Sequence, residues 1–434
     1  MRILIVSRLF PPSNAIGAVR PKNMADYLHE CGHEITCVTD VVAVPIVEMT
    51  PYRVLRVATG RIGKWFSRHN AKRASEVSIS HTEKKEQNDK VSVLSIVRSK
   101  LNTQVRNVLF VVDELEWAQN VVKTLCAEPN NFSFDIVITS FGPLSAVLIG
   151  RRLKRKHKRT VWISDMRDAM DVYSQAGWRR LLFASIQKRM TREADAITTV
   201  SRAMTDKFSR LNGAPVYTIE NGYAHILSEA SSARQDGALV ICYTGSLYGG
   251  LRMMDALFTA IAEIKRRHNG ASSIVVRYAG ADGQSAMEQA RAYDVQEQLD
   301  VRGVLSRKEA AQLQESADVL CVVSWNTKHE QGILTGKFPE YMRLRKPILS
   351  IVSGDLPDAE LSERVRECGD AGMDFEYVRE RDKERLTAWL DALASQKKSG
   401  CPLPTIPAVI VEKYDYKNLM ATFNKIVVET EGRK

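Results

Sequence analysis

Cysteine is scarce in this chain of 434 residues, and its cysteines are not arranged for a structural role. The seven cysteines stand singly, no CxxC pair occurs, and the nearest two are Cys31 and Cys37. Disulfide scaffolds and zinc sites both need cysteines at characteristic close spacings. The sequence therefore predicts neither, and it favours a reducing, cytoplasmic location.

Long hydrophobic runs are also missing. No uncharged apolar stretch has the length needed to cross a bilayer, and the mean hydropathy is −0.23. The apolar part of Met1–Ser7 is too short for a signal peptide and predicts a first strand. With 44% hydrophobic and 26% charged residues, the chain has the composition of a globular protein with two or three domains.

Two motifs of nucleotide chemistry are absent. The first turn, residues 8–20, contains only Gly17 and so lacks the GxGxxG fingerprint of dinucleotide-binding enzymes, which argues against an oxidoreductase. No DxD sequence occurs, so a metal–diphosphate site of that type is not predicted.

Positive charge is concentrated in the first half of the chain. Residues 1–215 hold 34 Lys and Arg against 20 Asp and Glu, a net charge of +14, whereas residues 216–434 hold 28 against 31, a net charge of −3. Such asymmetry indicates that the first half meets an anionic partner. Nucleic acid, an anionic membrane and a phosphate-bearing substrate all remain possible at this point.

Short apolar runs alternate with helical patterns along the whole chain, which predicts an α/β protein with Rossmann-like units. The predicted strands are 3–6, 35–38, 135–139, 160–163, 196–200, 216–219, 239–243, 274–279, 319–323 and 347–351, and the predicted helices include 22–30, 144–154, 181–193, 253–267, 307–316 and 409–428. The polar stretch 223–237 reads as a linker between two sheets. Residues 60–100 lack a regular pattern and read as an insertion.

Two strand–helix turns are candidate phosphate contacts. In the first turn, Arg20 near the helix start is placed to meet a phosphate, although a simple connection would also explain the turn. In the second turn, 244–252, Gly245 and the following glycines let backbone approach a ligand, and Arg252 supplies a positive charge. A merely flexible turn is the alternative.

Two further segments carry candidate side chains. In 330–349 a glycine loop with Lys337 precedes a short helix, where Glu340 is able to accept both hydroxyls of a ribose; a solvated helix carboxylate is the alternative. At the end of the strand near 163, Asp165, Arg167 and Asp168 stand where α/β folds bind ligands, or else form a capping cluster.

Together these segments resemble the family 4 (group 1) glycosyltransferases of the GT-B fold, of the bacterial surface-polysaccharide type. The similar stretches, in chain order, are 1–20, 32–39, 164–168, 194–201, 219–223 and 336–348. They include "GHEITCVT" at 32–39, "SDMRD" at 164–168 and "GKFPEY" at 336–341.

The resemblance implies two Rossmann-like domains facing each other across a cleft. Residues 1–230 would bind the acceptor, residues 231–408 the nucleotide-sugar donor, and the helix in 409–434 would return to the first domain. The implied reaction is metal-independent transfer of a sugar with retention of configuration, without a cofactor, from a nucleoside-diphosphate sugar to a glycan or polyprenyl-pyrophosphate-linked acceptor.

The same resemblance assigns the site residues. The donor site comprises Gly245, Ser246, Arg252, Gly336, Lys337 and Glu340, and the acceptor site comprises Asn14, Gly17, Arg20, Asp165 and Arg167. The catalytic residues are Asp168, Glu330, Arg252 and Lys337. Arg252 and Lys337 would stabilise the leaving diphosphate, and Asp168 would orient a hydroxyl.

Three positions depart from the family pattern. Gly332 stands where many members have a first glutamate, with Glu330 two residues upstream as a substitute; Ser246 replaces an arginine, and Arg345 replaces a glycine. A non-catalytic nucleotide-sugar-binding protein is therefore an alternative function. A nucleic-acid-binding protein is a weaker one, because no basic–aromatic module of a known type is found.

Two stretches are candidates for contact with the inner face of the plasma membrane. Residues 61–68 place Trp65 and Phe66 among cations, and residues 178–190 place apolar side chains at 178, 181, 182, 186 and 190 on one helical face. Packing of the second stretch against the core is the alternative.

Overall fold

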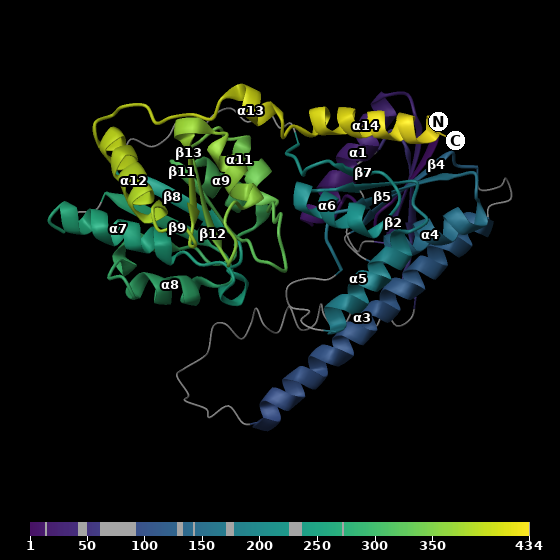
Figure 1. Cartoon of the computed structure of the whole chain (residues 1–434), viewed down its shortest axis with the longest axis horizontal. Coiled ribbons are helices and arrows are strands. Elements are labelled where there is room, and N and C mark those ends of the chain that lie inside the picture. The colour runs from purple at the N-terminus through teal and green to yellow at the C-terminus, as the bar shows by residue number, and fades with distance from the viewer. Residues whose placement is uncertain are drawn as a thin grey trace.

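The computed structural model describes residues 1–13, 15–41, 50–60, 93–127, 133–141, 144–170, 178–224, 237–270 and 273–433. Two parallel sheets organise these residues (Figure 1). Asn14, the stretch 61–68 and most of the linker at 223–237 lie outside the described residues, so the interpretations that concern them stay predictions.

The first sheet has the strand order β3-β2-β1-β4-β5-β6-β7, and every pair is parallel. Its strands are β1 (Arg2–Val6), β2 (Glu34–Asp40), β3 (Arg53–Val57), β4 (Ile136–Phe141), β5 (Val161–Met166), β6 (Ala196–Thr199) and β7 (Val216–Thr218). The helices in this half are α1 (Val19–Glu30), α3 (Val93–Ala127), α4 (Ser145–Lys156), α5 (Trp178–Thr191) and α6 (Arg202–Leu211).

The second sheet has the order β10-β9-β8-β11-β12-β13, again with parallel pairs. Its strands are β8 (Leu239–Thr244), β9 (Ile274–Ala279), β10 (Leu299–Val301), β11 (Val319–Trp325), β12 (Ile348–Ser353) and β13 (Gly372–Glu376). The helices that follow are α7 (Asp255–Arg267), α8 (Gly283–Arg291), α9 (Arg307–Glu315), α10 (Lys337–Met342), α11 (Glu360–Arg366), α12 (Asp382–Lys398), α13 (Ala408–Glu412) and α14 (Tyr416–Gly432).

In each sheet the chain adds strands first on one side of the first strand and then on the other. The strand order therefore switches between β1 and β4 in the first sheet and between β8 and β11 in the second. In open α/β sheets, ligands bind outside the carboxyl ends of the strands at such a point. The apolar runs fit this arrangement because every residue of β4, β5 and β11 is buried. The α/β class with two Rossmann-like units, predicted from the sequence, is confirmed.

The last helix packs on the first sheet rather than on the second. Tyr416, Met420, Phe423, Ile426 and Val427 of α14 share one core cluster with Ile3 and Ile5 of β1, and α14 lies beside α1 in Figure 1. Residue 223 forms a bridge with residue 415, which joins the end of the first half to the start of this helix.

Two expectations about elements are corrected. The single helix expected at 409–428 is two helices, because the chain turns between α13 and α14, and the Asp415 side chain accepts a hydrogen bond from Lys417 N at 2.8 Å to cap α14. The irregular insertion expected at 60–100 ends earlier, since α3 begins at Val93.

Three strands were not predicted. β3 and β10 are short edge strands, and β13 has the polar residues Asp374 and Glu376 at buried positions. Residues outside the strand provide partners for both carboxylates. Arg385 lies 3.1 Å from Asp374, and Glu376 accepts hydrogen bonds from Asp358 N and Ala359 N. A pattern of buried apolar residues does not reveal such a strand.

Candidate active site

The loop between β1 and α1 is held by an arginine from the end of β5. Arg167 Nη1 donates to the carbonyl oxygen of Gly17 at 2.8 Å, and Nε donates to that of Phe141 at 3.0 Å. A Cβ at residue 17 would lie 2.7 Å from Leu9 Cδ1, so glycine permits this close packing. Arg167 thus positions two loops at the carboxyl edge of the first sheet.

Arg20 and Asp165 form a buried ion pair. Their side chains are 1% and 0% exposed, and Arg20 Nη2 lies 2.7 Å from Asp165 Oδ1. Ser140 and Thr198 each donate to the same carboxylate at 2.9 Å. Burial opposes ionisation of Asp165, but the charge and hydrogen bonds of Arg20 outweigh it and lower its pKa.

This pair corrects the expected roles of both residues. Arg20 was expected near a phosphate and Asp165 in the acceptor site, yet neither presents its charge to solvent. Arg20 also donates to the carbonyl oxygen of Glu220 at 2.9 Å, so it ties α1 to β5 and to the residues after β7. Their placement supports a positioning role beneath the site.

Asp168 lies two residues beyond β5 and differs from Asp165 in reaching solvent. The protein around its carboxyl desolvates it and raises its pKa, while the charge of Arg167 opposes the increase. A carboxyl that is both accessible and perturbed is a feature of functional sites.

On the second sheet, the turn after β8 is organised by Asp282. Its carboxylate accepts hydrogen bonds from Ser246 Oγ at 2.7 Å and from Leu247 N at 2.6 Å. Ser246 Oγ in turn accepts from Tyr248 N at 3.1 Å. Ser246 therefore shapes the turn, and the adjoining Gly245 bonds through its N–H to the carbonyl oxygen of Ala279 at 2.9 Å.

Arg252 contacts two neighbouring aromatic rings. Its guanidinium carbon lies 4.3 Å from the Tyr248 ring centroid and 5.4 Å from that of Trp325. Nη1 donates to the carbonyl oxygen of Ser246 at 3.2 Å, whereas the buried Nε has no hydrogen-bond partner among the described residues. The two rings, whose centroids lie 5.7 Å apart, contact the cation without neutralising it.

Glu330 reaches the same cluster through Trp325. The indole Nε1 donates to Glu330 Oε2 at 3.1 Å. The structure thus brings Ser246, Arg252 and Glu330 together, with Tyr248 and Trp325 between them. The sequence analysis missed both aromatic residues; the signals available were a Tyr inside the glycine-rich turn and a Trp at the last position of a strand.

Lys337 and Glu340 stand on α10, beside the same turn. Lys337 Nζ lies 3.1 Å from Glu340 Oε2, and Arg307 Nη2 lies 3.8 Å from Glu340 Oε1. The buried Tyr341 hydroxyl lies 3.2 Å from Thr244 Oγ1, which anchors α10 to the end of β8. In this state Glu340 is neutralised by neighbouring cations.

The two halves meet at the loop that precedes α10. A Cβ at Gly336 would lie 3.6 Å from Ile16 Cγ1 of the β1–α1 loop. Gly332 has φ of +70°, and a Cβ there would lie 2.6 Å from Ser201 Oγ and 2.7 Å from Ala203 Cβ. The close approach of α6 therefore explains why glycine replaces the glutamate expected at 332.

Further contacts join the two halves beside Gly332. Glu360 accepts hydrogen bonds from Arg202 N at 2.9 Å and Ala203 N at 3.3 Å, and Arg364 Nη2 lies 2.6 Å from Glu220 Oε1. The β1–α1 loop and the loop before α10 thus lie where the two halves meet.

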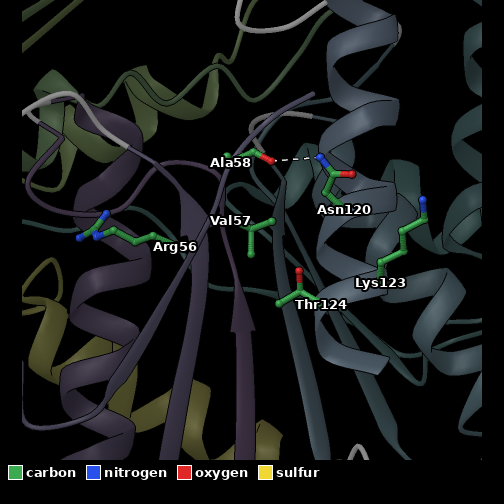
Figure 2. Close-up of a pocket in the computed structure, with 6 residues that line it drawn as sticks. All are labelled: Arg56, Val57, Ala58, Asn120, Lys123 and Thr124. Carbon is green, nitrogen blue, oxygen red and sulfur yellow. Dashed lines mark hydrogen bonds between the residues drawn. The ribbon is translucent and has the colours of Figure 1, made fainter. Parts of the chain in front are cut away.

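A separate pocket lies at the edge of the first sheet (Figure 2). It encloses about 370 Å³ between the end of β3 and α3. Arg56 and Lys123 point away from one another, and the Asn120 side chain donates to the Ala58 carbonyl oxygen at 3.1 Å. Its cations do not converge, so it is not part of the candidate site.

Comparison with known proteins agrees with the fold. Residues 17–222 match the glycosyl transferase 4-like domain family. No curated protein sequence matches the chain.

Three solved structures are similar over almost the whole chain. Sucrose-phosphate synthase from Thermosynechococcus elongatus is 12% identical with a TM-score of 0.64, covering 100% of both chains. HepE from Anabaena, in complex with UDP and glucose, is 12% identical with a TM-score of 0.58, covering 99% of this chain and 100% of its own. The lipopolysaccharide outer core galactosyltransferase WaaB is 12% identical with a TM-score of 0.57, covering 99% of each.

The matched residues span most of the first sheet, and the solved structures extend the likeness to both sheets. Residues 17–222 match the glycosyl transferase 4-like domain, and the two sheets together have the GT-B fold of these solved structures.

Proposed function

We propose that this protein is a glycosyltransferase that moves a sugar from a nucleoside-diphosphate sugar to a glycan or polyprenyl-pyrophosphate-linked acceptor in cell-surface polysaccharide synthesis. Transfer retains the anomeric configuration and uses no metal and no cofactor. The enzyme works in the cytoplasm at the inner face of the plasma membrane.

One observation carries this proposal: a cationic, aromatic cluster on the second sheet faces the β1–α1 loop of the first. Ile16 and Gly336 mark the approach of the two loops, and Arg252, in contact with the Tyr248 and Trp325 rings, supplies a cation on the second sheet. A diphosphate leaving group develops negative charge as the glycosidic bond breaks, and preoriented cations stabilise that charge.

The described side chains divide the chemistry between them. Arg252 and Lys337 neutralise the diphosphate, Glu340 accepts hydrogen bonds from the ribose, and Glu330 holds Trp325 against Arg252. Asp168, accessible at the end of β5, orients the acceptor or sugar hydroxyl. The two cations carry the electrostatic role that a divalent metal has in DxD enzymes, which supports metal-independent transfer.

The neighbours support the donor class. HepE was solved with UDP and glucose, and WaaB is described as a lipopolysaccharide outer core galactosyltransferase. UDP and UDP-hexoses are therefore the first probes. The net charge of +14 in residues 1–215 supports an anionic acceptor on the side of the first sheet.

A thermal-shift screen over nucleoside diphosphates and their sugars tests donor binding, because a ligand of the folded state raises the melting temperature by mass action. We expect a shift with one nucleoside diphosphate and its sugar, followed by transfer to a polyprenyl-pyrophosphate-linked saccharide in the presence of EDTA. The absence of any shift across the screen would contradict the donor assignment. Inhibition by EDTA would contradict metal independence.

A non-catalytic nucleotide-sugar-binding protein is the second candidate. The observation that favours it is Gly332, where packing against Ser201 and Ala203 leaves no room for the family glutamate. Donor binding without transfer, with a range of lipid-linked and free glycan acceptors, would single out this alternative.

A further inference from the structure

Apolar side chains are exposed on two helices of the first half. On α3, Val108, Phe110, Val111 and Leu115 are 62%, 45%, 43% and 40% exposed. On α5, Leu181, Leu182 and Ile186 are 73%, 47% and 37% exposed. Residues 108, 111 and 115 follow a helical spacing, as do 182 and 186, so each helix presents a stripe rather than scattered residues.

Both stripes lie at the same end of the first domain. Each of these helices precedes a strand, α3 before β4 and α5 before β6, so their N-terminal ends lie at the carboxyl edge of the sheet. The ion pair of 2.6 Å between Asp113 of α3 and Arg8, two residues after β1, confirms that position. Helix α4 contacts both α3 and α5, and α3 extends beyond the sheet in Figure 1.

Positive charge surrounds this apolar surface. Residues 178–191 contain Arg179, Arg180, Lys188 and Arg189 and no acidic residue, and Lys188 and Arg189 are exposed. On α3, Asp113 and Glu114 stand beside the stripe, but they are buried and pair with Arg8. An exposed apolar stripe with exposed cations beside it, as on α5, is suited to an anionic lipid surface.

We propose that the exposed stripes of α3 and α5 dock the enzyme on an anionic membrane leaflet. This extends the proposed function, because the stripes lie at the edge that also holds Asp168 and the β1–α1 loop, so docking would bring a lipid-linked acceptor to the site. A second copy of the chain is a poorer occupant. Symmetric pairing of the same surface would set cations against cations.

The test is flotation of the full chain with lipid vesicles, without donor or acceptor. The vesicles contain phosphatidylcholine alone or phosphatidylcholine with about 30% phosphatidylglycerol, which gives their surface a negative potential. We expect binding to the anionic vesicles at low salt and its loss at high salt. Equal binding to both vesicle types, or no binding to either, would overturn the proposal.

Variants locate the surface. Leu181→Ser with Leu182→Ser should lower the vesicle partition coefficient by about tenfold or more, because two apolar side chains no longer enter the leaflet. Lys188→Gln and Arg189→Gln should each lower it by about fivefold. The matched controls are Val304→Ser and Val409→Ser, 77% and 66% exposed on the second half, and Lys383→Gln on α12, all expected to bind as the wild type does.

Three readouts keep the outcome clear. The melting temperature checks folding of each variant, and the two charge variants test the surface even if the leucine variant fails to fold. UDP-sugar affinity should stay unchanged, so failure of docking and failure of the proposed donor site are separable. Sedimentation of wild type as a dimer that Leu181→Ser converts to monomer would assign the stripes to a second copy and overturn the proposal.

Discussion

At the residue scale, the donor side already contains its own counter-charges. Lys337 Nζ lies 3.1 Å from Glu340 Oε2, and Arg252 contacts the rings of Tyr248 and Trp325. A bound nucleoside diphosphate would add negative charge beside Lys337 and ribose hydroxyls beside Glu340. In the proposed function, the two side chains would exchange their contact with each other for contacts with the donor.

Glu340→Ala should weaken binding of the nucleotide-sugar donor about tenfold or more, because hydrogen bonds to a charged acceptor contribute about 1.5–3 kcal/mol. Isothermal titration calorimetry measures the change, with the exposed Glu384→Ala on α12 as control. Donor affinity equal to the wild type in a folded Glu340→Ala protein would remove Glu340 from the site.

The raised pKa of Asp168 predicts that turnover depends on pH. Because burial raises its pKa above the ordinary value of 3.8, its carboxylate is lost on acidification at a higher pH than that of a free aspartate. We expect kcat/KM to fall on the acid side above pH 3.8 in the wild type. Asp168→Asn should lower kcat and abolish this acid limb; a pH profile shared by both proteins would exclude Asp168 from the reaction.

The Arg20–Asp165 pair predicts a different pH effect, on stability. The folded-state pKa of Asp165 lies below 3.8, so its contribution is present above that pH and is lost as the pH falls through the folded-state value. Arg20→Met leaves a buried charge unpaired and should cost about 3–5 kcal/mol at pH 7. Urea unfolding at pH 7 measures it. The control is Lys22→Met on the same helix, which removes a partly exposed ion pair with Asp26 and is expected to change stability little.

At the element scale, α14 is the part of the second half that stabilises the first. Phe423 is fully buried in the cluster that contains Ile3 and Ile5, whereas Val428 on the same helix is 50% exposed. This helix follows the second sheet in the chain and therefore packs against the first sheet from the far end of the sequence.

Phe423→Ala should destabilise the protein by about 3–5 kcal/mol, the cost of truncating a buried aromatic side chain. The exposed Val428→Ala should stay within about 0.5 kcal/mol of the wild type. Equilibrium denaturation followed by tryptophan fluorescence compares the two, and equal effects would contradict the packing of α14 on this core.

At the scale of the whole molecule, the two sheets are linked by polar contacts beside Gly332. Glu360 bonds two backbone N–H groups of α6, and Arg364 pairs with Glu220. Burial raises the pKa of Glu220, while the charge of Arg364 opposes the change. Contacts of this kind fix the angle between the domains without a large apolar interface.

Glu360→Ala should leave the N–H groups of Arg202 and Ala203 without this acceptor and favour a more open arrangement. We expect a larger radius of gyration in small-angle scattering, with little change in the stability of either sheet. Glu384→Ala again serves as control. Scattering profiles that coincide for wild type and Glu360→Ala would show that other contacts set the domain angle.

Much of the fold and part of the candidate site follow from the sequence. Uninterrupted apolar runs such as Ile136–Phe141 need burial on both faces, which in a chain with alternating helices means parallel sheets. Arg252 lies in the turn after β8, and Lys337 and Glu340 lie on α10 after the loop that follows β11. Their position after strands already indicates a ligand edge. The charge of residues 1–215 is likewise a property of composition.

Tertiary structure decided the rest, because it determines which charges meet. Arg20 and Asp168 look equally suited to a ligand in the sequence, yet Arg20 is buried against Asp165 while Asp168 reaches solvent. The pairing of Glu330 with Trp325, the closeness of Gly332 to α6 and the polar strand β13 depend on residues far apart in the chain. A local pattern reports the burial that a segment needs, but the partner that satisfies a buried or enclosed polar group is supplied only when the sheets have assembled.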